Sequence, residues 1–166
     1  KIDEIEKTTK HDVIAFLTDV SQRVGEDGRF LHLGLTSSDI LDTSLGLLLR
    51  EAADILLADV ERLLAALKKK AFQYRDTIMI GRTHGIHAEP TTFGLKMGLW
   101  YQEMLRNRRR LLQAKETISI GKISGAVGTF SFVDPAVEEY VCRKLGLQPA
   151  PVSSQIVQRD RHAEYF

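Results

Sequence analysis

The sequence predicts an all-α fold built as a bundle of long helices, and its periodicity carries that prediction. Apolar residues recur every three or four positions from Leu41 to Ala71, the spacing of one helix face. Alternating β-branched and aromatic runs, which would predict strands, are almost absent. A helix of roughly thirty residues is about 50 Å long. A small domain cannot easily cover it, so we expect a bundle that forms an oligomer.

Residues that start or stop helices mark the expected elements in order along the chain. Gly25 and Gly146 suit helix ends, Asp134–Pro135 suits a helix start, and Pro90 suits the first turn of a long helix. The expected helices are 12–24, 39–74, 89–117, 135–145 and a last one from about 153. Polar or glycine-rich connections, where function usually lies, separate them at 28–38, 80–88, 121–129 and 146–153.

Charge balance and cysteine content exclude several classes of protein. Lysine and arginine number 23 and aspartate and glutamate 22, so the sequence does not predict a nucleic-acid partner. Cys142 is the one cysteine, which excludes a disulfide-stapled secreted scaffold and fits a reducing, cytoplasmic location. Charges interrupt the apolar stretches and the first residues lack a signal-peptide layout, so no membrane contact is expected.

Histidines and hydroxyl side chains lie in or beside the connections, and each has a simple structural interpretation. Residues 36–39 (TSSD) can cap the long helix, because hydroxyl and carboxylate oxygens accept its free N–H groups. His84, His87 and Glu89 match no familiar metal pattern, so no metal is expected. Basic runs at 68–70 and 106–110 are interpreted as solvated or intersubunit helix faces.

Considered together, these segments indicate a binding site for a substrate with several negative charges. Lysine, histidine, threonine and serine donors at helix ends suit anions, which helix N-termini favour. His84 stands between Gly81 and Gly85, where it can approach a ligand closely and transfer a proton near neutral pH. No nucleotide-cofactor motif is present, so no cofactor is expected.

Five blocks, in order and in register over essentially the whole chain, resemble the adenylosuccinate lyase family of the fumarase/aspartase superfamily. They are TKHDV at 9–13, HLGLTSSD at 32–39, GRTHGIHAEPTTFG at 81–94, GKISGAVGTF at 121–130 and QIVQRDRHAEY at 155–165. The resemblance implies a carbon–nitrogen lyase of purine biosynthesis. Such an enzyme releases fumarate by β-elimination from adenylosuccinate, giving AMP, and from succinyl-aminoimidazole-carboxamide ribotide.

The resemblance also implies roles for individual residues. His84 would be the general acid, and Thr83 would contact a succinyl carboxylate. His11 would act in catalysis and in substrate binding with its neighbours. The substrate-binding residues would be Lys10, His11, Asp12, Thr36, Ser37, Thr83 and Gln155, with His32 and Ser38 near the site. Many relatives have arginine where Lys10 stands, which leaves a bidentate phosphate contact there open.

One family segment is not found in this sequence. The serine-rich loop running into Met-Pro-x-Lys-x-Asn-Pro supplies the general base in the family, and we expect the chain to be an internal slice that lacks it. Residues 1–35 would end an N-terminal helical domain and residues 36–166 would begin the central bundle. The resemblance implies a homotetramer in which three subunits build each active site. Alternatives are an argininosuccinate lyase or fumarase type of enzyme, and a non-catalytic helical scaffold.

Overall fold

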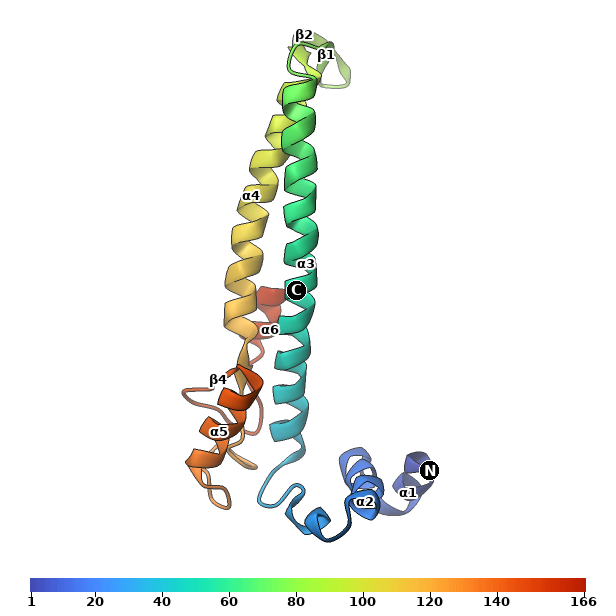
Figure 1. Cartoon of the computed structure of the whole chain (residues 1–166), viewed down its shortest axis with the longest axis vertical. Coiled ribbons are helices and arrows are strands. Elements are labelled where there is room, and N and C mark those ends of the chain that lie inside the picture. The colour runs from blue at the N-terminus through green and yellow to red at the C-terminus, as the bar shows by residue number, and fades with distance from the viewer. The chain divides into compact units, whose positions relative to one another are not determined.

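The computed structural model describes residues 1–166 (Figure 1). These residues divide into two compact units. The first unit comprises Lys1–Leu48 and Ser119–His162, and the second comprises Leu49–Ile118 and Ala163–Phe166. The predicted all-α class is confirmed, because the chain is mostly helical. The expected long helix is α3, Ser37–Gln73, whose first turns belong to the first unit and whose remainder belongs to the second.

The first unit opens with short helices whose boundaries follow from their capping residues. Helix α1 spans Ile2–Thr9, which the sequence analysis did not predict, and α2 spans Asp12–Val24 as expected. A 3-10 helix, η1, follows at Gly25–Phe30. Gly25 ends α2 with φ 71°, a conformation that glycine adopts without steric cost.

Two short strands and helix α5 also belong to the first unit. Strand β3, Ile120–Gly121, pairs in parallel with β4, Gln148–Pro149. Helix α5, Pro135–Leu145, has the predicted ends: the Asp134 carboxylate accepts the Ala136 N–H at 2.9 Å, and Gly146 has φ 67°. A small buried cluster, Ile120, Ala150 and Val157, packs beside these strands.

The predicted start of the last helix, near Ser153, is wrong. Helix α6 spans Asp160–Tyr165, and the residues before it are not helical. The Val157 N–H donates to the Asp42 carboxylate at 2.8 Å, so it is not available to a helical ladder. A tertiary contact therefore overrides the local capping signal.

The second unit contains two long helices that lie side by side (Figure 1). Helix α4 spans Phe93–Ile118 and pairs with α3 through ion pairs between Lys115 and Asp54 and between Arg108 and Glu61. No helix of the chain combines the length and apolar character needed to cross a membrane.

A β-hairpin joins α3 to α4 and corrects the sequence prediction. Strand β1, Ile78–Thr83, pairs antiparallel with β2, Ile86–Thr92, so α4 begins at Phe93 and not at Glu89. Pro90 lies opposite Ile80 in the hairpin instead of in a helical turn. The Thr92 hydroxyl accepts the Leu95 N–H at 3.1 Å, which makes Thr92 the cap that starts the helix.

Candidate active site

The first unit holds a cavity of about 580 Å³ bordered by side chains that the sequence analysis singled out. Its polar lining includes His11, His32, Thr36, Ser37 and Gln155. Apolar side chains of α2 and of the loop before α3 complete the wall: Ile14, Leu17, Leu31 and Leu35. The polar residues come from three separate parts of the chain, so the fold brings them together.

His11 joins α1 to α2 and caps the second helix. Its Nδ1 accepts the Ile14 N–H at 3.5 Å, which requires that this nitrogen carry no proton. In the neutral ring the proton then sits on Nε2, which can donate to a ligand. The Asp12 carboxylate lies 3.3 Å from Nδ1 and would pair with the ring if it became protonated. The residue therefore suits an anionic or hydrogen-bond-accepting ligand.

Three predicted site residues of the first unit do not border this cavity. Lys10 is the left-handed C-cap of α1, with φ 53°, and lines a separate shallow hollow with Asp3, Glu6 and Lys7. One oxygen of the Asp12 carboxylate accepts the Val13 N–H at 2.8 Å. Ser38 lies in the first turn of α3 and is not among the cavity-lining residues.

His32 borders the cavity from a strained loop. Its φ is 62°, an uncommon conformation for a residue other than glycine, and its buried Nδ1 has no hydrogen-bond partner in the chain. Gly34 follows with φ 74°, and a Cβ there would lie 2.3 Å from the Phe132 carbonyl oxygen. Close packing against residues 132–133 therefore fixes the shape of this loop.

The start of α3 carries a cap from the segment that the sequence suggested, residues 36–39, and its carboxylate provides it. The Asp39 carboxylate accepts the Thr36 backbone N–H at 2.9 Å, as an acidic residue three positions into a helix does in a capping box. This bond fixes the backbone of Thr36 at the cavity wall. Thr36 and Ser37 both border the cavity, so the structural and the functional interpretations of this segment are compatible.

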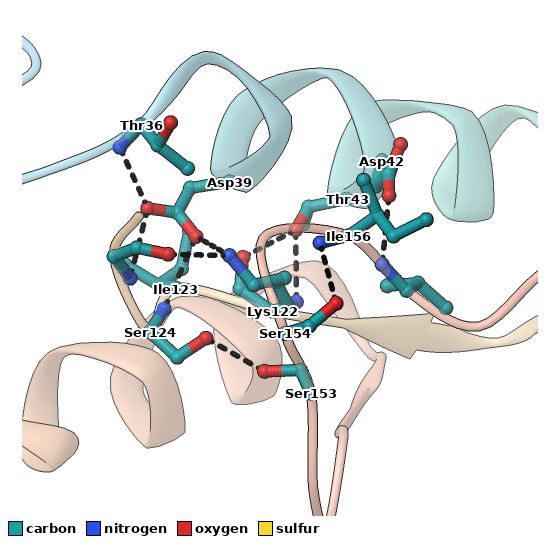
Figure 2. A network of polar contacts seen from close by, with 12 residues as sticks. Thr36, Asp39, Asp42, Thr43, Lys122, Ile123, Ser124, Ser153, Ser154 and Ile156 are labelled. Carbon is teal, nitrogen blue, oxygen red and sulfur yellow. Dashed lines mark hydrogen bonds and ion pairs between the residues drawn. The ribbon is translucent and has the colours of Figure 1, made fainter. Parts of the chain in front are cut away.

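Asp39 also forms a buried ion pair with Lys122 of the glycine-rich segment (Figure 2). The pair fixes residues 121–125 against α3, and Thr43 adds reciprocal bonds at 2.9 Å to the Lys122 backbone N–H and carbonyl. From the sequence, Asp39 is interpreted only as part of a helix cap, and Lys122 has no assigned role. A lysine within an otherwise apolar, glycine-rich segment was the signal that could have pointed to a buried partner.

A second carboxylate of α3 positions the segment that carries Gln155. Asp42 accepts the Val157 N–H and pairs with both terminal nitrogens of Arg159, at 3.0 and 3.1 Å. This two-bond geometry favours one orientation of the guanidinium. Because Val157 is two residues from Gln155, the contact holds the glutamine's segment where Gln155 borders the cavity.

His84 and Thr83 belong to the hairpin of the second unit. The two-residue turn consists of His84 and Gly85, with φ 51° and 75°, between the paired residues Thr83 and Ile86. Positive φ at both central positions is the type I′ geometry, which matches the twist of a hairpin. The His84 side chain is exposed at this tip. The turn therefore leaves the His84 imidazole accessible to a ligand or to another protein chain.

Burial perturbs two titratable groups beneath the glycine-rich segment. Burial raises the pKa of the Glu138 carboxyl, because desolvation is the largest influence on it. The hydrogen bond that the Ile123 N–H donates at 2.7 Å acts in the opposite direction and is the smaller effect. Desolvation also raises the pKa of the Cys142 thiol to about 11. No group of three or more His, Cys, Asp or Glu side chains is placed to hold a metal ion.

The comparison with protein families gives a match over the whole chain. A family model described as "Lyase" matches residues 1–166. The chain belongs to this lyase family. Over its full length it is 58% identical to the adenylosuccinate lyase of Bacillus subtilis strain 168, and it covers 38% of that protein. It is 56% identical over 164 residues to the adenylosuccinate lyase of Aquifex aeolicus, again covering 38%. The resemblance seen in the sequence is confirmed.

Solved structures agree with the family and the helical class. A fumarate lyase from Mesorhizobium sp. BNC1 superposes with a TM-score of 0.90 at 30% identity, over 98% of this chain and 39% of that one. The 3-carboxy-cis,cis-muconate lactonizing enzyme from Pseudomonas putida gives 0.88 at 30%, over 99% and 38%. The chain thus spans about two fifths of the length of the proteins it matches.

Proposed function

We propose that the protein carrying this chain is an adenylosuccinate lyase of purine biosynthesis. The observation that carries the proposal is the cavity of the first unit, where His11, Thr36 and Gln155 meet from three family-like blocks. The 58% identity to a relative named adenylosuccinate lyase supports the choice of substrate. The proposed substrates are adenylosuccinate and succinyl-aminoimidazole-carboxamide ribotide.

The proposed reaction breaks one C–N bond by β-elimination. A base removes a proton from the succinyl carbon next to a carboxylate, and that electron pair forms the double bond of fumarate. The C–N electron pair leaves with the nitrogen, which an acid protonates. Adenylosuccinate is thereby divided into fumarate and AMP, and neither water nor a cofactor is consumed.

The proposed roles follow the chemistry of each side chain. His84 protonates the departing nitrogen, since imidazole exchanges protons near neutral pH, and Thr83 beside it contacts a succinyl carboxylate. Thr36 and Ser37 bind a succinyl carboxylate at the N-terminus of α3, where an anion is favoured. His11, with Lys10 and Asp12, binds near the phosphate and the leaving group. Gln155 donates to the substrate, and His32 and Ser38 lie nearby.

We place the general base, a serine, outside these 166 residues. The family loop that carries it is not found in this sequence. The isolated chain should therefore release no fumarate under conditions in which the complete protein does. Release by the pure chain would show that this serine is dispensable.

We further propose a cytoplasmic homotetramer whose helices are covered by other copies. The second unit leaves large apolar side chains of α3 and α4 exposed, among them Ile55, Leu63, Leu95, Leu99 and Trp100. It also has an open, largely apolar cavity of about 1010 Å³ bordered by Met79, Ile80, Leu95 and Leu99. Apolar surface on this scale favours protein contact. Native mass spectrometry of the complete protein should give four copies, and a monomer would contradict the assembly.

A substrate panel tests the proposed function. The purified complete protein should release fumarate from adenylosuccinate and from the imidazole substrate, with AMP formed in equal amount from the first. Argininosuccinate and malate should give little fumarate. Preference for either of these would favour one of the other superfamily lyases. That alternative is open because a fumarate lyase structure at 30% identity has a similar fold. No turnover of any member would favour the non-catalytic scaffold.

A further inference from the structure

A buried ion pair lies directly behind the α3 wall of the cavity. The side chains of Asp39 and Lys122 are both 0% exposed, and the lysine Nζ pairs with Asp39 Oδ1 (Figure 2). Burying two charges costs free energy unless they are paired and hydrogen-bonded. A buried ion pair of this kind is therefore weak evidence for a purely stabilising role.

Every contact of the pair is directed to backbone next to the cavity or to the glycine-rich turn. The Asp39 carboxylate accepts N–H groups from Thr36 at 2.9 Å, Ser124 at 3.1 Å and Gly125 at 3.1 Å. Lys122 Nζ also donates to the Gly125 carbonyl at 3.0 Å. Thr36 borders the cavity. The pair therefore connects Thr36 at the cavity wall to the buried residues 121–125 of the glycine-rich segment.

The charges of the pair bear on what the cavity can bind. The N-terminus of α3 favours an anion through its free N–H groups and its dipole. The Asp39 carboxylate is hydrogen-bonded to the Thr36 backbone. If its charge were not neutralised, it would repel an anionic ligand bound at the same helix end. The ammonium of Lys122 cancels that charge. The Asp39 cap can then fix Thr36 without making the helix end repulsive to an anionic ligand.

We propose that Asp39 and Lys122 are positioning residues for the carboxylate-binding wall of the cavity. Asp39 fixes the Thr36 backbone, and Lys122 neutralises Asp39 so that a carboxylate can bind at the start of α3. This inference rests on the proposed function, because the ligand is taken to be the succinyl carboxylate. Neither residue is a catalytic residue, since both act through Thr36 and the helix end.

The test compares the two products of the proposed reaction in the complete protein. Lys122→Gln removes the charge and keeps a hydrogen-bond donor. The inhibition constant for fumarate should rise at least about tenfold, because two like charges a few ångströms apart repel appreciably even at a protein surface. The inhibition constant for AMP should change less than about threefold, because the contacts proposed for the phosphate and the leaving group are with His11, Lys10 and Asp12. Equal weakening of both ligands, or of neither, would overturn the inference.

A double variant separates charge from structure. Asp39→Asn combined with Lys122→Gln removes both charges, and the amide oxygen that remains at position 39 can still accept the Thr36 N–H. Fumarate binding should then return to within about threefold of the parent. Fumarate binding that stays tenfold weak in the double variant would overturn the neutralising role. Because the double variant leaves neither residue 39 nor residue 122 charged, this comparison remains decisive even if Lys122→Gln alone does not fold.

Glu138→Gln is the matched control. Glu138 is also buried and holds the same segment through the Ile123 N–H, but the structure records no bond from it to Thr36. Because Glu138 interacts with the charges of Lys122 and Asp39 and Glu138→Gln removes a carboxyl, this variant should not weaken fumarate binding. A tenfold rise in the fumarate constant would reduce the Lys122 effect to a loosened loop. A parent that neither releases nor binds fumarate would overturn the proposed function together with this inference. An active parent with an unchanged Lys122→Gln variant would overturn the inference alone.

Discussion

The two units of the chain differ in how their functional segments are held in place. In the first unit, carboxylates at the start of α3 bind distant backbone: Asp39 holds residues 124–125, and Asp42 holds Val157. In the second unit, the ion pairs between α3 and α4 are at least partly exposed. Large apolar side chains are exposed in both units. Buried hydrogen bonds within the chain thus hold the functional segments of the first unit in place.

The difference indicates what each unit needs from other molecules. The first unit already has a polar cavity whose wall residues are fixed by internal hydrogen bonds. The second unit presents His84 on an exposed hairpin tip. Like the first unit, it also leaves large apolar side chains exposed, here on its two long helices. On our proposal the first unit contributes binding residues and the second contributes the acid and the assembly surface. The following variants test this division.

The largest effect is expected at the hairpin tip. His84→Gln in the complete protein should lower turnover at least about 100-fold, the usual contribution of a general acid. Steady-state kinetics with adenylosuccinate measure the change. His87→Gln, on the same exposed hairpin, is the control and should stay within a few-fold of the parent. A His84→Gln enzyme with near-normal turnover would remove the acid from the second unit.

Glycine substitutions compare the packing of the two units. Gly34→Ala should lower the free energy of unfolding by about 2 kcal/mol, because positive φ and a 2.3 Å approach to the Phe132 carbonyl both oppose a Cβ. Gly85→Ala in the hairpin has φ 75° but nothing within 4 Å, so only backbone strain remains, about 1 kcal/mol. Denaturant unfolding measures both. Equal losses would mean that the tight packing around residue 34 contributes nothing.

A smaller effect is expected where the first unit binds substrate. Gln155→Leu should raise KM about tenfold with kcat little changed, since it removes a hydrogen bond made in both the ground state and the transition state. Gln158→Leu is the matched control in the same segment, because Gln158 donates to the Val152 carbonyl and does not line the cavity. Comparable KM values for the two variants would argue against a substrate contact at Gln155.

The smallest effect concerns alkaline pH. Burial raises the pKa of Cys142 from 9.0 to about 11, so the folded thiol keeps its proton where the unfolded thiol ionises. Stability is therefore lost as pH rises through this range, by about 1 kcal/mol between about pH 8 and 9.5. Unfolding of the parent and of Cys142→Ala at both pH values isolates the contribution. A difference between parent and variant that does not change with pH would contradict it.

Local signals in the sequence predicted the elements whose ends are capped by their own neighbours. Helix α2 and helix α5 begin and end where His11, Gly25, Asp134 and Gly146 stand. The hairpin was missed because Gly81, Pro90 and charged residues weaken its alternation. Its turn depends on positive φ at His84 and Gly85, which the sequence analysis did not consider.

Long-range contacts account for what the sequence could not reveal. The last helix starts late because Asp42, 115 positions away, takes the Val157 N–H. The pairing of Asp39 with Lys122 spans 83 positions and depends on the fold as a whole. For the candidate site, the sequence supplied His11, His32, Thr36, Ser37 and Gln155, which border one cavity. It did not supply the buried groups that hold them.

Subunit complementation tests most directly the claim that the two units contribute different shares of one active site. The His84→Gln and Gln155→Leu proteins are purified separately, dissociated, mixed and allowed to reassociate. If acid and binding residues of one site come from different copies, some mixed assemblies contain an unaltered site. With adenylosuccinate well below KM, where the Gln155→Leu protein is also slow, the account predicts that fumarate release by the mixture rises well above the average of the two variants. Release equal to that average, with mixed assemblies demonstrated by mass spectrometry, would contradict it.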